Sequence, residues 1–139
     1  MATLTIAQLL AIASAALQAN GNPEKIQPRE IVAFAMVESS LRNLPPYLDG
    51  QTQAFGLYGF HLARWRECGK RREDWGRADA VMQTRVMVQS LTRYYRSAKR
   101  AKAPDRLQWA AHFHNAGHGE SVETAYTAKL RRALREIPD

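Results

Sequence analysis

A single acidic side chain stands at the end of the most apolar stretch of the chain. Residues 31–37 are all apolar, and Glu38 and Ser39 follow them directly. Pro28 suits the first turn of a helix, so we predict a helix over residues 28–42 that is buried on every side. Burial disfavours the charged form of a carboxyl, raises its pKa and lets it hold a proton near neutral pH. Glu38 is therefore a candidate general acid, and an ordinary glutamate on the first exposed turn of the helix is the plainer alternative.

The segment after this helix has the composition of a turn that approaches a site. Pro45-Pro46 cannot continue a helix and Asp49-Gly50 is a turn signal, so we expect a short hairpin or an irregular flap over residues 47–55. Residues 54–60 then combine two glycines with three aromatic residues. Glycine allows the backbone to come close to a neighbouring group while rings line the space, although a tight turn is also consistent with this pattern.

The elements that must position these residues are mainly helices. Apolar periodicity, capping residues and breaker clusters predict about six of them and little strand, in one domain over residues 1–139. The expected ranges are about 5–18, 28–42, 61–67, from Asp74 or Asp79 to about Ala101, from Asp105 to about His114, and from about Ser121 to Ile137.

Composition and charge narrow the classes of function. The net charge is +7, with three basic and four acidic side chains in residues 1–60 against 17 basic and nine acidic in residues 61–139. A basic half suggests an anionic partner such as nucleic acid, a membrane surface or bacterial cell wall. No apolar run approaches the roughly 20 residues of a membrane span, and the N-terminal segment is expected to be a core helix and not a signal peptide.

Cysteine and histidine usage gives no sign of a disulfide or a metal. Cys68 is the only cysteine, which excludes an internal disulfide. His112, His114 and His118 lie close together in the sequence, but no carboxylate or cysteine with a suitable spacing completes a set of ligands. We therefore expect no metal and no cofactor.

Four motifs occur in a fixed order along the chain. They are Glu38-Ser39 after the apolar run, Gly56-Leu57 after the polar segment, Asn115-Ala116-Gly117 after an amphipathic helix, and Glu123-Thr124-x-Tyr126 at the start of the last helix. This order resembles the soluble lytic transglycosylase family and its goose-type lysozyme relatives, over about residues 6–134. The resemblance implies an all-α domain, α+β lysozyme-like at most. The chain departs from the family where Gly59 replaces a glutamine and where His114 replaces a tyrosine.

The resemblance also implies a reaction and a set of roles. The family cleaves the β-1,4 bond between N-acetylmuramic acid and N-acetylglucosamine in peptidoglycan. Glu38 would protonate the glycosidic oxygen and then deprotonate the C6 hydroxyl that closes a 1,6-anhydro ring, with Ser39 orienting it. The residues expected to bind substrate or to position Glu38 are Phe55, Gly56, Leu57, Tyr58, His114, Asn115 and Tyr126.

Other functions remain open at this level. An inverting muramidase would need a second carboxylate as base, for which Asp49 is the candidate, and a turn-forming role for Asp49 is the alternative. A non-catalytic module that binds cell wall or a virion protein is a further possibility. Binding of nucleic acid is not expected, because the basic side chains are scattered around a long helix.

The expected setting is a phage lysin or a virion-associated enzyme. Such a protein is made in the cytoplasm without a signal peptide and reaches the cell wall by lysis or injection. Peptidoglycan would be its main partner, with phage virion proteins as further partners.

Overall fold

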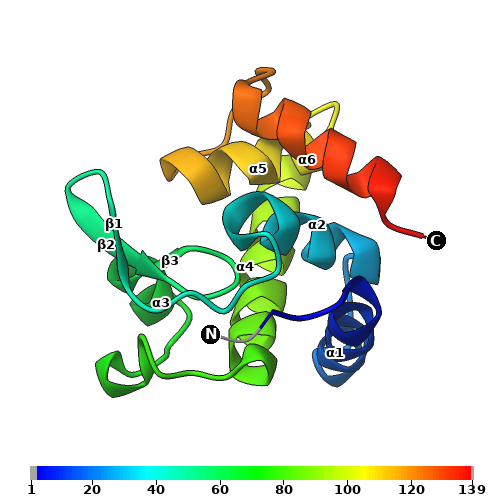
Figure 1. The fold of residues 1–139 in the computed structure, drawn as a ribbon. Helices are drawn as coiled ribbons and strands as arrows, with labels where there is room; N and C mark the ends of the chain where they lie inside the picture. Colours follow the sequence, from blue (N-terminus) through cyan, green and yellow to red (C-terminus); the bar gives the residue numbers. More distant parts are fainter. Residues whose placement is uncertain (1–2, 139) are drawn as a thin grey trace.

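Helices surround one central helix in the structure, a computed structural model that describes residues 3–138 (Figure 1). The helix α2 lies between the α1 and α4 helices on one side and the α5 and α6 helices on the other, and a small sheet stands to the left (Figure 1). The helices are α1 (Ile6–Ala19), α2 (Pro28–Ser39), α3 (Leu62–Glu67), α4 (Ala80–Arg100), α5 (Arg106–Ala116) and α6 (Ala125–Glu136), with a 3-10 turn, η1 (Arg72–Asp74). The prediction of a mainly helical chain is confirmed.

The start of α2 is fixed by local chemistry. Pro28 occupies the first turn, where its missing N–H is not needed, and the backbone N–H of Gln27 donates to the Glu30 carboxylate at 2.5 Å. The other Glu30 oxygen accepts a hydrogen bond from the Tyr95 hydroxyl of α4 at 2.6 Å. The first turn of α2 is thereby attached to the longest helix of the fold.

The end of α2 comes three residues earlier than predicted. Ser40 and Leu41 adopt left-handed backbone conformations, with φ of 55° and 65°, which end the helix at Ser39. The carbonyl of Leu41 then accepts a hydrogen bond from the backbone N–H of Leu4 at 2.9 Å. The hydrogen bond between Leu41 and the N-terminal segment is therefore formed in place of a helix that continues to Arg42. Glu38 consequently lies in the last turn of α2.

The expected hairpin is present and has a third strand. The antiparallel strands β1 (Tyr47–Asp49), β2 (Thr52–Phe55) and β3 (Phe60–His61) lie in that order, with Asp49 opposite Thr52 and Ala54 opposite His61. Gly50 forms the turn between β1 and β2 with φ of +68°. The sheet thus brings Tyr47 of β1 and Gly59, just before β3, close to Glu38 in the last turn of α2.

Side-chain caps set the starts of the C-terminal helices. Asp79 accepts from the Met82 N–H to begin α4, and Asp105 accepts from the Gln108 N–H to begin α5, as predicted. The last helix begins at Ala125, three residues later than a cap at Ser121 predicts, because Thr124 accepts the capping hydrogen bond from the Thr127 N–H. This places Tyr126 in the first turn of α6.

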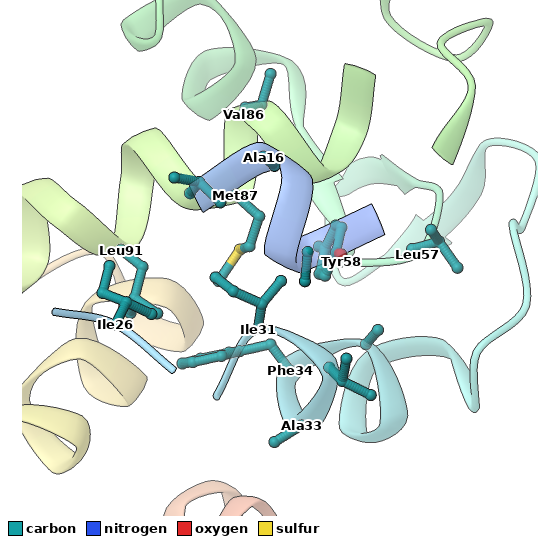
Figure 2. Close-up of a cluster of buried hydrophobic side chains, with 14 of the residues drawn as sticks. Ala16, Ile26, Ile31, Ala33, Phe34, Leu57, Tyr58, Val86, Met87 and Leu91 are labelled. Atoms are coloured by element: carbon teal, nitrogen blue, oxygen red, sulfur yellow. The ribbon is translucent and has the colours of Figure 1, made fainter. Parts of the chain in front are cut away.

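The core lies between α1, α2 and α4. Five consecutive residues of the apolar run, residues 31–35, are fully buried, which confirms burial of α2 on every side over this stretch. Figure 2 shows Ile31 and Phe34 of α2 next to Met87 and Leu91 of α4. None of the helices in residues 3–138 is long and apolar enough to cross a membrane.

Candidate active site

Glu38 lies where α2 meets α6 and the sheet, and its carboxyl is largely enclosed. Its side chain is 18% exposed, and one carboxyl oxygen accepts a hydrogen bond from the Tyr126 hydroxyl at 2.8 Å. Burial raises the pKa of Glu38 from an ordinary 4.5 to about 7; the Tyr126 hydrogen bond opposes this shift and the charge of Asp49 adds to it. The group is thus balanced between acid and carboxylate near neutral pH, as a general acid requires.

Gly59 allows the backbone after β2 to lie directly against the Glu38 carboxyl. A Cβ at this position would lie 2.4 Å from the Glu38 Oε2 and 3.2 Å from the Tyr47 hydroxyl, and the backbone φ is +64°. Only glycine meets both conditions without displacing the carboxyl. The close backbone approach expected for residues 54–60 is therefore found at Gly59.

The buried ring of His114 lies beside Glu38. Its Nε2 lies 4.0 Å from the Glu38 Oε1 and donates to the Tyr58 carbonyl at 2.8 Å, and its side chain is 3% exposed. The ring makes an edge contact with Phe34 at 5.3 Å between centroids. Burial lowers the pKa of His114 to about 4, so the imidazole is neutral at pH 7 and its charge does not oppose protonation of Glu38.

Asp49 lies in the sheet within electrostatic reach of Glu38. Its Oδ2 accepts a hydrogen bond from the His61 Nε2 at 2.9 Å, and the His61 Nδ1 lies 2.7 Å from the Thr52 hydroxyl. Because a carboxylate only accepts, Nε2 carries the proton and Nδ1 accepts from Thr52 when the ring is neutral. This chain of contacts holds the Asp49 carboxylate in one orientation.

Two adjoining recesses open beside this cluster. The first is lined by Gly59, His114 and Asn115 together with Phe60, His61, Ala63, Arg64, Glu67 and Gly117. The second is lined by Thr52, Gln53, His61, Leu62, Ala63, Arg72, Glu73, Trp75 and Arg77. His61 and Ala63 line both recesses, so the two adjoin each other between the end of α5 and the sheet. Gly59 and His114 lie against the Glu38 carboxyl and also line the first recess. Adjoining recesses suit a ligand with more than one unit.

The structure brings some of the predicted site residues together and not others. Tyr126 and His114 lie next to Glu38, Asp49 lies in the facing sheet, and Asn115 is exposed at the recess. The Ser39 hydroxyl does not orient Glu38, because it donates to the Ala35 carbonyl one turn earlier at 3.0 Å.

The expectation that Phe55, Gly56, Leu57 and Tyr58 bind substrate is wrong for the three side chains, and Gly56 packs on a buried side chain. Phe55, Leu57 and Tyr58 are at most 1% exposed, and the Tyr58 hydroxyl hydrogen-bonds Thr84 at 2.8 Å. A Cβ on Gly56 would lie 2.1 Å from the Gln83 Oε1, an atom that accepts from the Leu57 N–H. These side chains point inward because burial of their aromatic and aliphatic surface lowers the free energy of the folded state.

Sequence reasoning missed Tyr47, Gly59 and His61 as members of the site. Tyr47 lies close enough to Glu38 and Asp49 that its pKa rises to about 12, through burial first and their charges next. The two glycines of residues 54–60 were a usable signal for Gly59. Tyr47 and His61 carry no comparable signal, because only strand pairing brings them near α2.

The helical domain with its small antiparallel sheet has an α+β lysozyme-like fold. A search of solved structures places it beside the lysozyme of Tapes japonica, with a TM-score of 0.58 and 22% sequence identity, over 79% of this chain and 89% of that chain. No protein-family profile and no curated protein sequence matches the chain. The lysozyme-like fold expected from the sequence is confirmed.

The raised pKa of Glu38 predicts a stability that falls with rising pH. The folded pKa of about 7 exceeds the unfolded 4.5, so the folded state binds more protons between these values, and this contribution is complete below pH 4.5 and lost as pH rises to about 7. At pH 8.5 the ionised Glu38 should cost roughly 3 kcal/mol of unfolding free energy relative to Glu38→Gln. Urea unfolding of both proteins at pH 4 and pH 8.5 measures this difference. An identical difference at the two pH values would contradict it.

Tyr126→Phe should move the pH profile of any reaction that uses Glu38 as an acid. The Tyr126 hydroxyl stabilises the carboxylate, so its removal raises the pKa of Glu38 above about 7 and keeps the acid protonated to higher pH. The alkaline limb of the rate profile should therefore shift upward. Tyr95→Phe is the matched control, because this buried hydroxyl donates to Glu30 at the opposite end of α2, at 2.6 Å. Equal profiles for both variants would remove Tyr126 from the site.

Proposed function

We propose that this protein is a glycosidase that cleaves the glycan strands of peptidoglycan, with Glu38 as the general acid. The observation that supports this proposal best is an enclosed carboxyl with a pKa near 7 in the last turn of a central helix, beside two adjoining recesses. The lysozyme-like fold and the basic half of the chain, which suits an anionic wall, support the same substrate class.

In the reaction, protonated Glu38 gives its proton to the glycosidic oxygen as the bond to C1 breaks through an oxocarbenium-like state. Glu38 is then a carboxylate, and it removes a proton from the nucleophile that attacks C1. If that nucleophile is the C6 hydroxyl of the same sugar, the product is a 1,6-anhydro ring and the enzyme is a lytic transglycosylase. One carboxyl group is sufficient for both proton transfers.

Hydrolysis is the second candidate, and the position of Asp49 favours it. Its carboxylate faces Glu38 closely enough to raise the pKa of that group and is held by His61 in the sheet. A second fixed carboxylate can activate water as a base, in which case the product is a reducing sugar. The enzyme would then be a muramidase of the lysozyme kind, and Asp49→Asn would abolish turnover.

Digestion of purified peptidoglycan, followed by mass analysis of the released muropeptides, tests both candidates. Products lighter by one water than hydrolytic ones, and absent with Glu38→Gln, would establish transglycosylation. Reducing products that disappear with both Glu38→Gln and Asp49→Asn would establish the muramidase. Absence of any release by the wild type, with retention on intact wall in a pull-down, would refute the enzyme and favour a binding module.

We propose a phage lysin or virion-associated enzyme that reaches the wall by lysis or injection, with virion proteins as further partners. Lysis of bacteria by the protein added together with a membrane-permeabilising agent, and not by the protein alone, is the expected result for an enzyme that must be delivered to the wall.

A further inference from the structure

A compact group of metal-ligating side chains lies beyond the candidate active site, where α5 ends and a loop turns toward α6. The His112 Nε2 lies 3.1 Å from the Glu120 Oε2, and the His118 Nε2 lies 3.4 Å from the same oxygen. One ligand atom from each of the three residues lies within 4.8 Å of the others. The expectation that no carboxylate completes a set of ligands is wrong, because the loop folds back and supplies Glu120.

The orientation of His112 is set before any ligand arrives. Its Nδ1 lies 2.7 Å from the His118 carbonyl oxygen, and because a carbonyl only accepts, Nδ1 carries the proton. The neutral ring then directs the lone pair of Nε2 toward Glu120. A backbone carbonyl behind a histidine is the usual arrangement that fixes the tautomer and the ring of a metal ligand. His112 is also 12% exposed, so its ring has little freedom to turn away.

The loop that carries the other two ligands is held against α5. A Cβ on Gly119 would lie 2.1 Å from the Trp109 ring, so this glycine packs directly on the indole, whose Nε1 donates to the Ser97 hydroxyl at 3.1 Å. The His118 ring lies 4.7 Å from that of His112, between centroids. Loop and helix therefore present the three ligands together and need little rearrangement to bind an ion.

One nitrogen of each histidine and one Glu120 oxygen face one another with the spacing of a metal site. Ligands at roughly 2.0–2.1 Å from a tetrahedral Zn²⁺ lie about 3.3 Å apart, close to the 3.1 Å and 3.4 Å between the histidine nitrogens and the Glu120 oxygen. Two imidazole nitrogens and one carboxylate oxygen suit Zn²⁺ and its transition-metal neighbours, whereas Ca²⁺ and Mg²⁺ prefer oxygen ligands alone. We propose that His112, His118 and Glu120 bind one Zn²⁺ or a similar divalent transition-metal ion, with water as the fourth ligand.

Such an ion would tie the loop to the last turn of α5, which also carries His114 and Asn115. Gly117, the residue that begins the loop, lines the recess together with Gly59. Bound metal would therefore stiffen one wall of the recess. The proposal concerns binding and stability, and it stands whether or not the peptidoglycan activity is found.

The test is titration of chelator-treated protein with ZnCl₂ in a calorimeter, together with thermal melts with and without Zn²⁺. We expect one equivalent bound by the wild type and a melting temperature raised by several degrees. His118→Ala and Glu120→Gln should each weaken binding by roughly 10–100-fold or more, since each removes a ligand. Glu123→Gln is the matched control, a nearby carboxylate that contacts Gln108 and Arg131.

Co²⁺ provides a readout of geometry in the same proteins. An intense visible absorption from four-coordinate Co²⁺ in the wild type and in Glu123→Gln, lost in Glu120→Gln, supports the site. Absence of saturable Zn²⁺ binding by the wild type would overturn the proposal and leave an ordinary histidine–carboxylate cluster. Equal Zn²⁺ binding by the wild type and both ligand variants would also overturn it.

Discussion

Glu38→Gln should abolish cleavage of peptidoglycan and leave the fold intact. The glutamine side chain has the same shape and can accept the Tyr126 hydrogen bond, but it has no proton to give to the glycosidic oxygen. General acid catalysis contributes roughly 10²–10⁴-fold, so we expect a loss of about 10³-fold or more in turnover. Release of soluble muropeptides over time measures it.

The fold of the variant must be checked in the same preparation. Its circular dichroism should equal that of the wild type, and its unfolding midpoint at pH 8.5 should be higher, because it lacks the enclosed negative charge. A variant that is folded and keeps wild-type turnover would remove Glu38 as the acid. A loss of activity accompanied by unfolding would not support Glu38 as the acid. Glu38→Ala, with its smaller side chain, would then serve as the second variant.

Gly59→Ala should be the most damaging substitution outside the carboxyl itself. The added methyl would lie 2.4 Å from the Glu38 Oε2 and must push the carboxyl away from its place beside Tyr126. A misplacement of about 1 Å at a reacting group can cost roughly 10²-fold in rate, and we expect a loss of at least that size. The same assay of muropeptide release measures it.

Backbone strain must be separated from this displacement. Alanine at a positive φ costs roughly 1–2 kcal/mol wherever it occurs, and Gly21→Ala supplies this cost alone, because its φ is +77° and no atom lies within 4 Å of the added Cβ. We expect Gly21→Ala to be destabilised to a similar degree and to keep its activity. If Gly59→Ala were as active as Gly21→Ala, the close packing of glycine on Glu38 would not be required for cleavage.

The two variants test different properties of one arrangement. Glu38→Gln removes the proton, whereas Gly59→Ala keeps the proton and changes where it is held. The neutral His114 ring and the backbone of Gly59 together enclose the Glu38 carboxyl and exclude solvent from it. That environment raises its pKa to about 7 at the expense of stability above this pH.

Much of the fold follows from the sequence because the responsible forces are local. The apolar run of residues 31–37, Pro28 and the capping aspartates Asp79 and Asp105 act within one or two turns of their own helix. Helix positions and the place of Glu38 at the end of α2 are therefore readable from the chain alone. His114 and Tyr126 were indicated by motif order, which reflects a resemblance and not a local force.

Only the tertiary structure decided what surrounds the carboxyl. Tyr126 lies 88 positions from Glu38 in the chain, and no local pattern specifies which atom its hydroxyl meets. The rings of Phe55 and Tyr58 point inward because burial of their apolar surface in the core is favourable. As a result, the backbone of Gly59 lies against Glu38. Likewise, Glu120 joined two histidines because Gly119 allows the loop to fold onto Trp109. The sequence by itself determined the helices and the position of Glu38 at the end of α2. Packing between distant segments determined which groups surround Glu38, since burial and close approach depend on the whole fold.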